Sequence, residues 1–155
     1  MERTLVIIKP DAVNRNLIGE VLHRFERKGV KIVGMKMVHL DDKILEEHYA
    51  HHKGKSFFPK LKEFMKKAPS IVLVLEGNEI IEVVRKFAGV TKGTEALPGT
   101  IRGDFSLSVQ ANIIHASDSK EAAQAEIKRF FSDKEIFSYP KIDSTYVYAE
   151  DELKA

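Results

Sequence analysis

The segment SIVLVL, residues 70–75, is apolar at almost every position. A short apolar run rich in β-branched residues predicts a buried strand, here a central strand of a sheet. TLVIIK, residues 4–9, has the same character and is closed by the breakers Pro10 and Asp11. These two runs predict the buried strands around which the rest of the chain is organised.

The segments around these runs alternate between strand and helix patterns. Strand patterns occupy residues 30–40 and 109–115, and helical spacing of apolar residues occupies 17–29, 80–88 and 117–131. Shorter helices are expected over 41–52 and 58–67. The resulting order resembles the ferredoxin-like βαββαβ arrangement, an α+β fold with helices packed on a four-stranded antiparallel sheet, here followed by a C-terminal tail.

Caps, a loop and the tail complete this expectation. We expect Asn78 to cap the helix over 80–88, and Asp118 with Glu121 to form a capping-box variant at the last helix. Residues 90–104 are rich in glycine and lack apolar periodicity, which predicts a long loop with a function. The tail from residue 132 is expected to pack on the body or on a neighbouring subunit.

The composition is that of an ordinary globular protein. The chain has 155 residues, 43% hydrophobic and 31% charged, which fits one domain over 1–155. Its net charge of +2 predicts no dedicated nucleic-acid binding. The apolar run of residues 5–8 is too short for a signal peptide or a membrane span, so we expect a cytoplasmic protein with no membrane association. Cysteine is absent, which excludes thiolate chemistry and disulfides.

NIIHASDS, residues 112–119, places His115 where an apolar strand meets the polar start of a helix. A strand-end histidine ordinarily fills space or meets solvent. In the following helix, however, Glu126 shares a face with Ala123 and Ile127, and a carboxylate turned toward the core needs a partner. If the imidazole of His115 is that partner, its second ring nitrogen is presented as a nucleophile. The alternative is a Glu126 that leans into solvent.

Phosphoryl transfer to such a nucleophile requires cations and oriented donors, because charge is spread over the phosphate oxygens. Taken one at a time, Lys and Arg are more often solvated surface groups. Association with special backbone positions singles out a few candidates, which are Lys9, Arg85, Thr91, Thr100 and Arg102.

Four segments resemble the signature segments of nucleoside diphosphate kinases. They are TLVIIKPDAV (4–13), HYAHHKGKSFFPKL (48–61), PGTIRGDF (98–105) and NIIHASDS (112–119). They occur in that family's order, and the similarity runs from about residue 3 to residue 148. The resemblance implies an enzyme that reversibly transfers the γ-phosphoryl group of a nucleoside triphosphate to a nucleoside diphosphate, by a ping-pong mechanism through a phosphohistidine.

The resemblance also implies roles for individual residues. His115 would be phosphorylated, with Glu126 and Ser117 as its supports and Lys9 in the catalytic set. Asp118 would reach a Mg²⁺ ion through water. The nucleotide would be bound by Lys9, Tyr49, Arg85, Thr91 and Arg102 at the phosphates, Asn112 and Lys9 at the ribose, Phe57 and Val109 around the base, and Leu61 at the entrance.

Two positions depart from the family's commonest pattern. Ala116 stands where a glycine usually follows the active histidine, and Lys92-Gly93 replaces an Asn-Pro pair. The family also implies a homo-oligomer, most often a hexamer, with the loop around Gly93 and the C-terminal tail near subunit contacts. We therefore expect any difference in this chain to affect assembly.

Other interpretations compete with the kinase. A non-enzymatic nucleic-acid-binding module is the main alternative, since ferredoxin-like folds also bind RNA. His48, His51 and His52 lie close together on the expected helix and invite a metal site, although no third segment completes it. Gly54-Lys55-Ser56 fails as a P-loop, because Tyr49 occupies the position of a required glycine.

Overall fold

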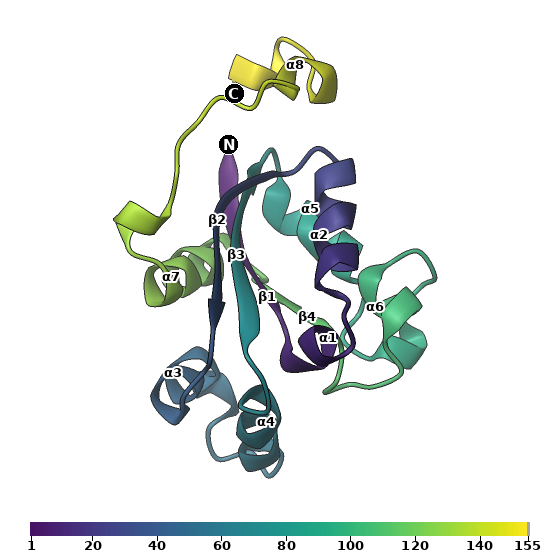
Figure 1. Cartoon of the computed structure of the whole chain (residues 1–155), viewed down its shortest axis with the longest axis vertical. Coiled ribbons are helices and arrows are strands. Elements are labelled where there is room, and N and C mark those ends of the chain that lie inside the picture. The colour runs from purple at the N-terminus through teal and green to yellow at the C-terminus, as the bar shows by residue number, and fades with distance from the viewer. Residues whose placement is uncertain (155) are drawn as a thin grey trace.

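The computed structural model describes residues 1–154 as an antiparallel sheet with helices on both faces (Figure 1). The sheet has the order β2-β3-β1-β4, with all neighbouring pairs antiparallel. This confirms the ferredoxin-like α+β prediction. The strands are β1 (Glu2–Ile8), β2 (Lys31–Val38), β3 (Ser70–Gly77) and β4 (Ile114–Ala116).

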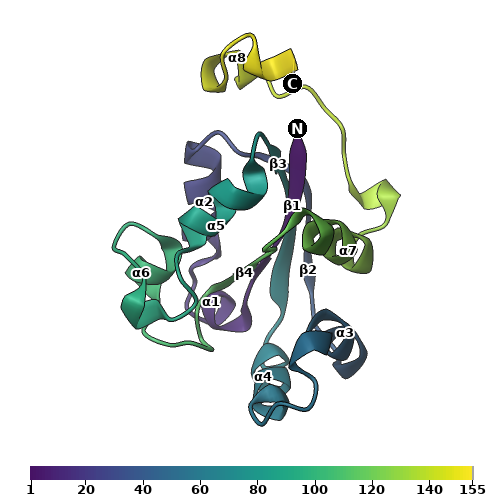
Figure 2. The ribbon, with the colours of Figure 1, turned by 180° about the vertical axis from the view of Figure 1, so that it is seen from behind.

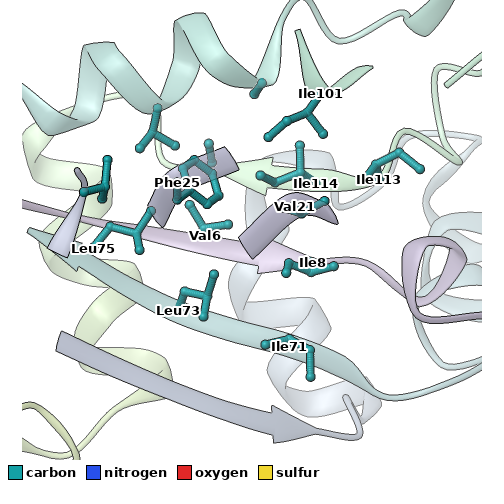
Figure 3. Close-up of a cluster of buried hydrophobic side chains, with 14 of the residues drawn as sticks. Val6, Ile8, Val21, Phe25, Ile71, Leu73, Leu75, Ile101, Ile113 and Ile114 are labelled. Carbon is teal, nitrogen blue, oxygen red and sulfur yellow. The ribbon is translucent and has the colours of Figure 1, made fainter. Parts of the chain in front are cut away.

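The inner strands β1 and β3 are buried on both faces, which explains their continuous apolar sequences. On one face, Val6 and Leu73 pack with Phe25 of α2 (Ile18–Arg27) (Figure 3). Ile80, the first residue of α5 (Ile80–Ala88), belongs to the same core. Phe25 has no exposed surface. This core therefore fixes α2 and α5 on one side of the sheet.

The other face of the sheet carries a second core. Leu5 and Val72 point to this side, because successive side chains of a strand alternate. They contact residues of α3 (Asp42–His48), α4 (Phe58–Met65) and α7 (Lys120–Phe130). Figure 2, seen from behind, shows α3, α4 and α7 on the side of the sheet opposite α2 and α5. This second layer brings α3 and α7 beside the end of β4.

Short helices fill the connections. Within residues 1–154 they are α1 (Pro10–Asn14), η1 (Ala50–His52), η2 (Gly93–Glu95), α6 (Ile101–Phe105), η3 (Asp133–Glu135), α8 (Ser144–Val147) and η4 (Glu152–Lys154). Two of them correct the sequence prediction. The expected loop over 90–104 contains η2 and runs into α6, and the helix expected over 41–52 divides into α3 and η1.

The last strand is much shorter than predicted. Among residues 109–116, only Ile114–Ala116 pair with β1, so the strand prediction was wrong for residues 109–113. Ile113 adopts φ 72°, a left-handed conformation that interrupts a strand. The preceding backbone is held instead by Ser108, whose Oγ accepts the N–H groups of Gln110 and Ala111.

Asp41 caps α3, in agreement with a cap predicted at Asp41 or Asp42, but the caps predicted for α5 and α7 were wrong. The residue that caps α5 is Glu79 with φ 48°, while the Asn78 side chain donates to the Glu152 carbonyl. The cap of α7 is Ser119, whose Oγ accepts the Ala122 N–H at 3.1 Å. Asn78 is used to attach the C-terminal tail, and Asp118 is left outside the helix.

The tail packs on the body, as expected. The Phe137 N–H donates to the Val33 carbonyl at 2.8 Å, and the Tyr139 hydroxyl donates to the Ile32 carbonyl at 2.7 Å. Both contacts are made along the edge strand β2. Further along this strand Met35 and Met37 are 57% and 58% exposed. In the described part of the chain, no helix has the length and apolar character needed to cross a membrane.

Candidate active site

His115 lies in β4, opposite Ile7 of β1, and its side chain is 22% exposed. Its Nε2 lies 3.1 and 3.0 Å from the two carboxylate oxygens of Glu126. Glu126 belongs to α7. The Ser117 hydroxyl donates to the same carboxylate at 2.5 Å. The expected contact between Glu126 and His115 is thus present, and the solvent-leaning Glu126 was the wrong alternative.

The electrostatics of this pair fix the roles of the two ring nitrogens. Burial alone would raise the pKa of Glu126, but the hydrogen bond and charge of His115, with the Ser117 hydroxyl, hold that pKa below its usual value. The charged carboxylate accepts a hydrogen bond from Nε2–H, and an imidazole that carries its single proton on Nε2 keeps a lone pair on Nδ1. Within residues 1–154 no hydrogen bond engages Nδ1.

A second histidine, which the sequence prediction did not assign to the pair, packs against it. The rings of His48 and His115 meet edge to face with centroids 4.6 Å apart. Burial, followed by the charge of His115, lowers the pKa of His48 to about 3, so His48 is neutral. Its Nδ1 accepts from Arg129 at 3.3 Å, consistent with a neutral ring. Arg129 is three residues after Glu126, a spacing that would have identified it as a neighbour on α7.

The metal hypothesis for the histidine-rich segment takes a different form in the structure. Ligand atoms of His48, His115 and Glu126 lie within 4.8 Å of one another, whereas His51 and His52 lie on η1. The Glu126 oxygens already accept hydrogen bonds, and the Arg129 guanidinium occupies His48 Nδ1. The arrangement orients His115 and offers a cation little free ligand capacity.

His115 opens into a cleft of about 840 Å³. Nearly every residue assigned to the site by sequence lines it, although these residues come from distant parts of the chain. They are Lys9, Tyr49, Phe57, Leu61, Arg85, Thr91, Arg102, Val109, Asn112, His115, Asp118 and Glu126. Ser117 lies behind Glu126 and does not line the cleft. Thr100 is not part of it either, because its hydroxyl caps α6 by accepting the Gly103 N–H.

Lys9 and Asn112 form the inner polar wall of the cleft. Lys9 Nζ donates to the Gln110 carbonyl and to Asn112 Oδ1, both at 2.8 Å. The Asn112 amide donates in turn to the carbonyls of Thr91 and Val109. Burial, opposed by the charge of Asp11 and aided by that of Arg102, lowers the pKa of Lys9 to about 8. The Lys9 ammonium is therefore positioned by two uncharged acceptors.

Arg102 is a buried residue that is bound mainly to backbone carbonyls. It is 8% exposed and donates to the backbone carbonyls of Gly89, Asn112 and Ile114. Burial and the charge of Arg85 lower its pKa to about 10, which still leaves it a cation at neutral pH. Arg102 thus braces the backbone beside His115 in addition to lining the cleft.

Phe57 and Val109 stand at the mouth of the cleft, 44% and 61% exposed. The ring of His52 contacts Phe57 edge to face, with centroids 5.1 Å apart. Leu61 of α4 is 8% exposed and also lines the cleft. The mouth therefore offers an apolar slot with an aromatic side.

The two departures in sequence have local explanations. Ala116 pairs with Val6 in β4 and has no positive φ, so a side chain is tolerated beside His115. Gly93 is sterically required, because a Cβ there would lie 2.4 Å from the Ser106 carbonyl oxygen. Its N–H also donates to the Ser108 carbonyl at 3.1 Å. This glycine is packed tightly and is not a point of looseness.

Comparison with known proteins identifies the family. The family model described as nucleoside diphosphate kinase matches residues 2–136. A nucleoside diphosphate kinase of Parabacteroides distasonis is 57% identical over 153 residues, 99% of this chain and 100% of that protein. That of Pyrococcus abyssi is 55% identical over 148 residues, 94% of this chain and 93% of that protein.

A solved structure agrees with these sequence relatives. The nucleoside diphosphate kinase of Halobacterium salinarum, in complex with CDP, superposes with a TM-score of 0.93 at 42% identity, covering 95% of this chain and 98% of that one. The fold agrees with this match. The chain belongs to the nucleoside diphosphate kinase family.

Proposed function

We propose that this nucleoside diphosphate kinase works through a phosphohistidine at His115. One observation carries the proposal: the Nε2 of His115 is held at 3.0 Å by the charged carboxylate of Glu126, while Nδ1 is free of hydrogen bonds within residues 1–154. A histidine so held presents one nucleophilic nitrogen in one orientation. The cleft beside it is lined by cations, as a phosphate donor requires.

The transfer takes place in two halves. Nδ1 of His115 attacks the γ-phosphorus of the triphosphate, an N–P bond forms, and the bond from that phosphorus to the bridging oxygen breaks. The diphosphate leaves with the electron pair of that bond. A second diphosphate then enters, its terminal oxygen attacks the same phosphorus, and the N–P bond breaks. Glu126 balances the positive charge that the ring develops in each half, and Ser117 keeps that carboxylate in place.

The polar wall has the donors to bind the transferred group. Lys9 and Arg85 supply charge, and Thr91 supplies a hydroxyl. Burial raises the pKa of Tyr49, so its hydroxyl remains a neutral donor. Arg102 uses part of its donor fork on three backbone carbonyls, which leaves further N–H groups for a phosphate oxygen.

The nucleoside is assigned to the mouth of the cleft. We assign the base to the slot between Phe57 and Val109, with Leu61 at its entrance, and the ribose hydroxyls to Asn112 and Lys9. Stacking on an aromatic face is tolerant of base identity. This supports a broad range of substrates, purine and pyrimidine nucleoside di- and triphosphates alike.

Asp118 fits the cofactor assignment. Three carboxylates line the cleft, and Glu126 and Glu47 are paired with His115 and Arg129. Asp118 is exposed and makes no hydrogen bond or ion pair within residues 1–154, so it can hold a water of a hydrated Mg²⁺. When bound to the nucleotide, Mg²⁺ would neutralise phosphate charge. Its preference for phosphate oxygens and retained waters agrees with a single outer carboxylate.

Assembly and location complete the proposal. We assign the chain to a homo-oligomer, specifically a hexamer. Each subunit is a single domain, and the hexamer is assigned to the cytoplasm. The exposed Met35 and Met37 on the edge strand β2, and Leu97 and Leu107 at 74% and 86% exposure, offer apolar surface that a second subunit can cover. Sedimentation at micromolar concentration tests the oligomer, and cell fractionation tests the location.

Kinetics test the mechanism itself. Double-reciprocal plots at several acceptor concentrations are expected to give parallel lines, because one histidine serves donor and acceptor in turn. Intersecting lines would contradict it. A nucleic-acid-binding module, the main alternative from sequence, is not favoured by the family match.

A further inference from the structure

The backbone two residues before His115 is strained. Ile113 has φ 72°, and the Ile114 N–H donates to the Asn112 carbonyl at 2.8 Å, which closes a tight turn around it. A β-branched residue rarely adopts this conformation, since its Cβ clashes with the backbone. Such strain persists only where surrounding contacts impose it. The turn determines how β4 enters the sheet and therefore where His115 points.

Several groups hold this turn from outside. The Lys9 N–H donates to the Ile113 carbonyl at 2.8 Å, and Arg102 donates to the carbonyls of Asn112 and Ile114. Within residues 1–154 the Ile113 N–H donates to one group only, Oδ2 of Asp11, at 3.0 Å. Lys9, Arg102 and Asn112 are already assigned to the nucleotide. Asp11 is the group in this set that has no assigned role.

Asp11 also acts on Lys9, a cation that lines the cleft. It lies in the first turn of α1, two residues after Lys9, and its charge acts on the Lys9 ammonium. Its second oxygen, Oδ1, is buried and has no hydrogen-bond partner within the described residues. A buried carboxylate oxygen left without a donor is costly. The charge of Asp11 therefore needs a nearby cation, and Lys9 is a cation on which that charge acts.

We propose that Asp11 is a positioning residue of the phosphotransfer site: its carboxylate locks the left-handed Ile113 through the N–H group and supplies the negative charge opposite Lys9. This inference deepens the proposed function and rests on it for the roles of His115 and Lys9. One side chain thereby couples the direction of the nucleophile to the charge of the phosphate-binding wall.

The effect of the Asp11 charge on Lys9 can be read from the pH dependence of kcat/KM. Burial lowers the pKa of Lys9 to about 8, Asp11 raises it and Arg102 lowers it, and the Phe64 ring of α4 lies 5.4 Å from Nζ. Removing the negative charge leaves burial and Arg102 unopposed, so the pKa of Lys9 falls further. The alkaline limb of kcat/KM, which reports the free enzyme, then moves to lower pH.

Asp11→Asn and Asp11→Ala separate the two halves. The amide oxygen of Asp11→Asn can still accept the Ile113 N–H, so activity at pH 6.5 stays within about threefold of wild type while the alkaline limb moves down by roughly one pH unit. Asp11→Ala leaves the N–H without a partner and lowers kcat/KM about tenfold or more at every pH. Asp41→Ala is the control, since Asp41 accepts a backbone N–H at the start of α3 and lies outside the cleft.

The measurements are pH profiles of kcat/KM from 6 to 9.5, with circular dichroism to confirm folding. A wild-type alkaline limb in Asp11→Asn, or wild-type kcat/KM in a folded Asp11→Ala, overturns the proposal. If Asp11→Ala does not fold, the position of the alkaline limb of kcat/KM in Asp11→Asn tests the proposal by itself. Failure of the proposed function is a separate result, because it appears as absent His115 phosphorylation in the wild-type enzyme.

Discussion

Replacing Glu126 by glutamine tests how the nucleophile is activated. The substitution preserves the shape of a side chain that is 12% exposed and contacts both His115 and Ser117. An amide can still accept the Nε2–H, but it carries no charge to oppose the positive ring. Two unit charges about 4 Å apart interact by roughly 4 kcal/mol at an effective dielectric constant near 20, and only part of a charge develops in the transition state. We therefore expect a loss of about 2 kcal/mol, or roughly thirtyfold in kcat.

Rapid-quench measurement of single-turnover phosphorylation gives this rate directly. Nucleotide affinity should change little, because Glu126 lies behind the imidazole and does not reach the phosphates. Glu121→Gln is the matched control, being an exposed glutamate in the first turn of the same helix. A phosphorylation rate for Glu126→Gln equal to that of the control would refute the role of the carboxylate charge.

Three further outcomes are expected. Phe57→Ala raises KM for purine and pyrimidine nucleotides alike, because about 1–3 kcal/mol of stacking free energy is lost. A change in KM for one class of base alone would contradict the assigned slot. Gly93→Pro lowers the thermal midpoint, because a Cβ would lie 2.4 Å from the Ser106 carbonyl oxygen; an increased midpoint would show that the contact yields. The free energy of unfolding falls as pH drops from 6.5 toward 3, since unfolded His48 binds a proton that the folded ring, with a pKa of about 3, refuses. His48→Phe should remove that part of the slope, at most about 1.4 kcal/mol per pH unit, in urea titrations.

The sequence predicted the fold because its strongest signals are local. SIVLVL and TLVIIK are buried on both faces and therefore lack polar alternation, so their patterns indicate inner strands without reference to the rest of the chain. The predicted strand over 109–113 failed for the opposite reason. Tertiary contacts from Asp11 and Arg102 hold Ile113 left-handed, and no local preference of isoleucine indicates this.

In the active site, too, some features could be predicted from local sequence and others depend on tertiary contacts. The contact of Glu126 with His115 could be predicted, since a carboxylate on an apolar helix face requires a partner. The role of His48 could not be predicted, because its neutrality depends on burial of the end of α3 against β4 and α7. The backbone role of Arg102 was equally hidden, since its carbonyl partners are brought together only by the folded turn.

Phosphorylation of His115 is tested most directly by mass spectrometry of the protein after incubation with ATP and Mg²⁺. The modified peptide should carry one phosphoryl group on His115, stable in alkali, labile in acid and lost on addition of a nucleoside diphosphate. His115→Ala should remain unmodified under the same conditions. Phosphate located on any other residue, or a wild-type protein that stays unmodified, would contradict transfer through this histidine.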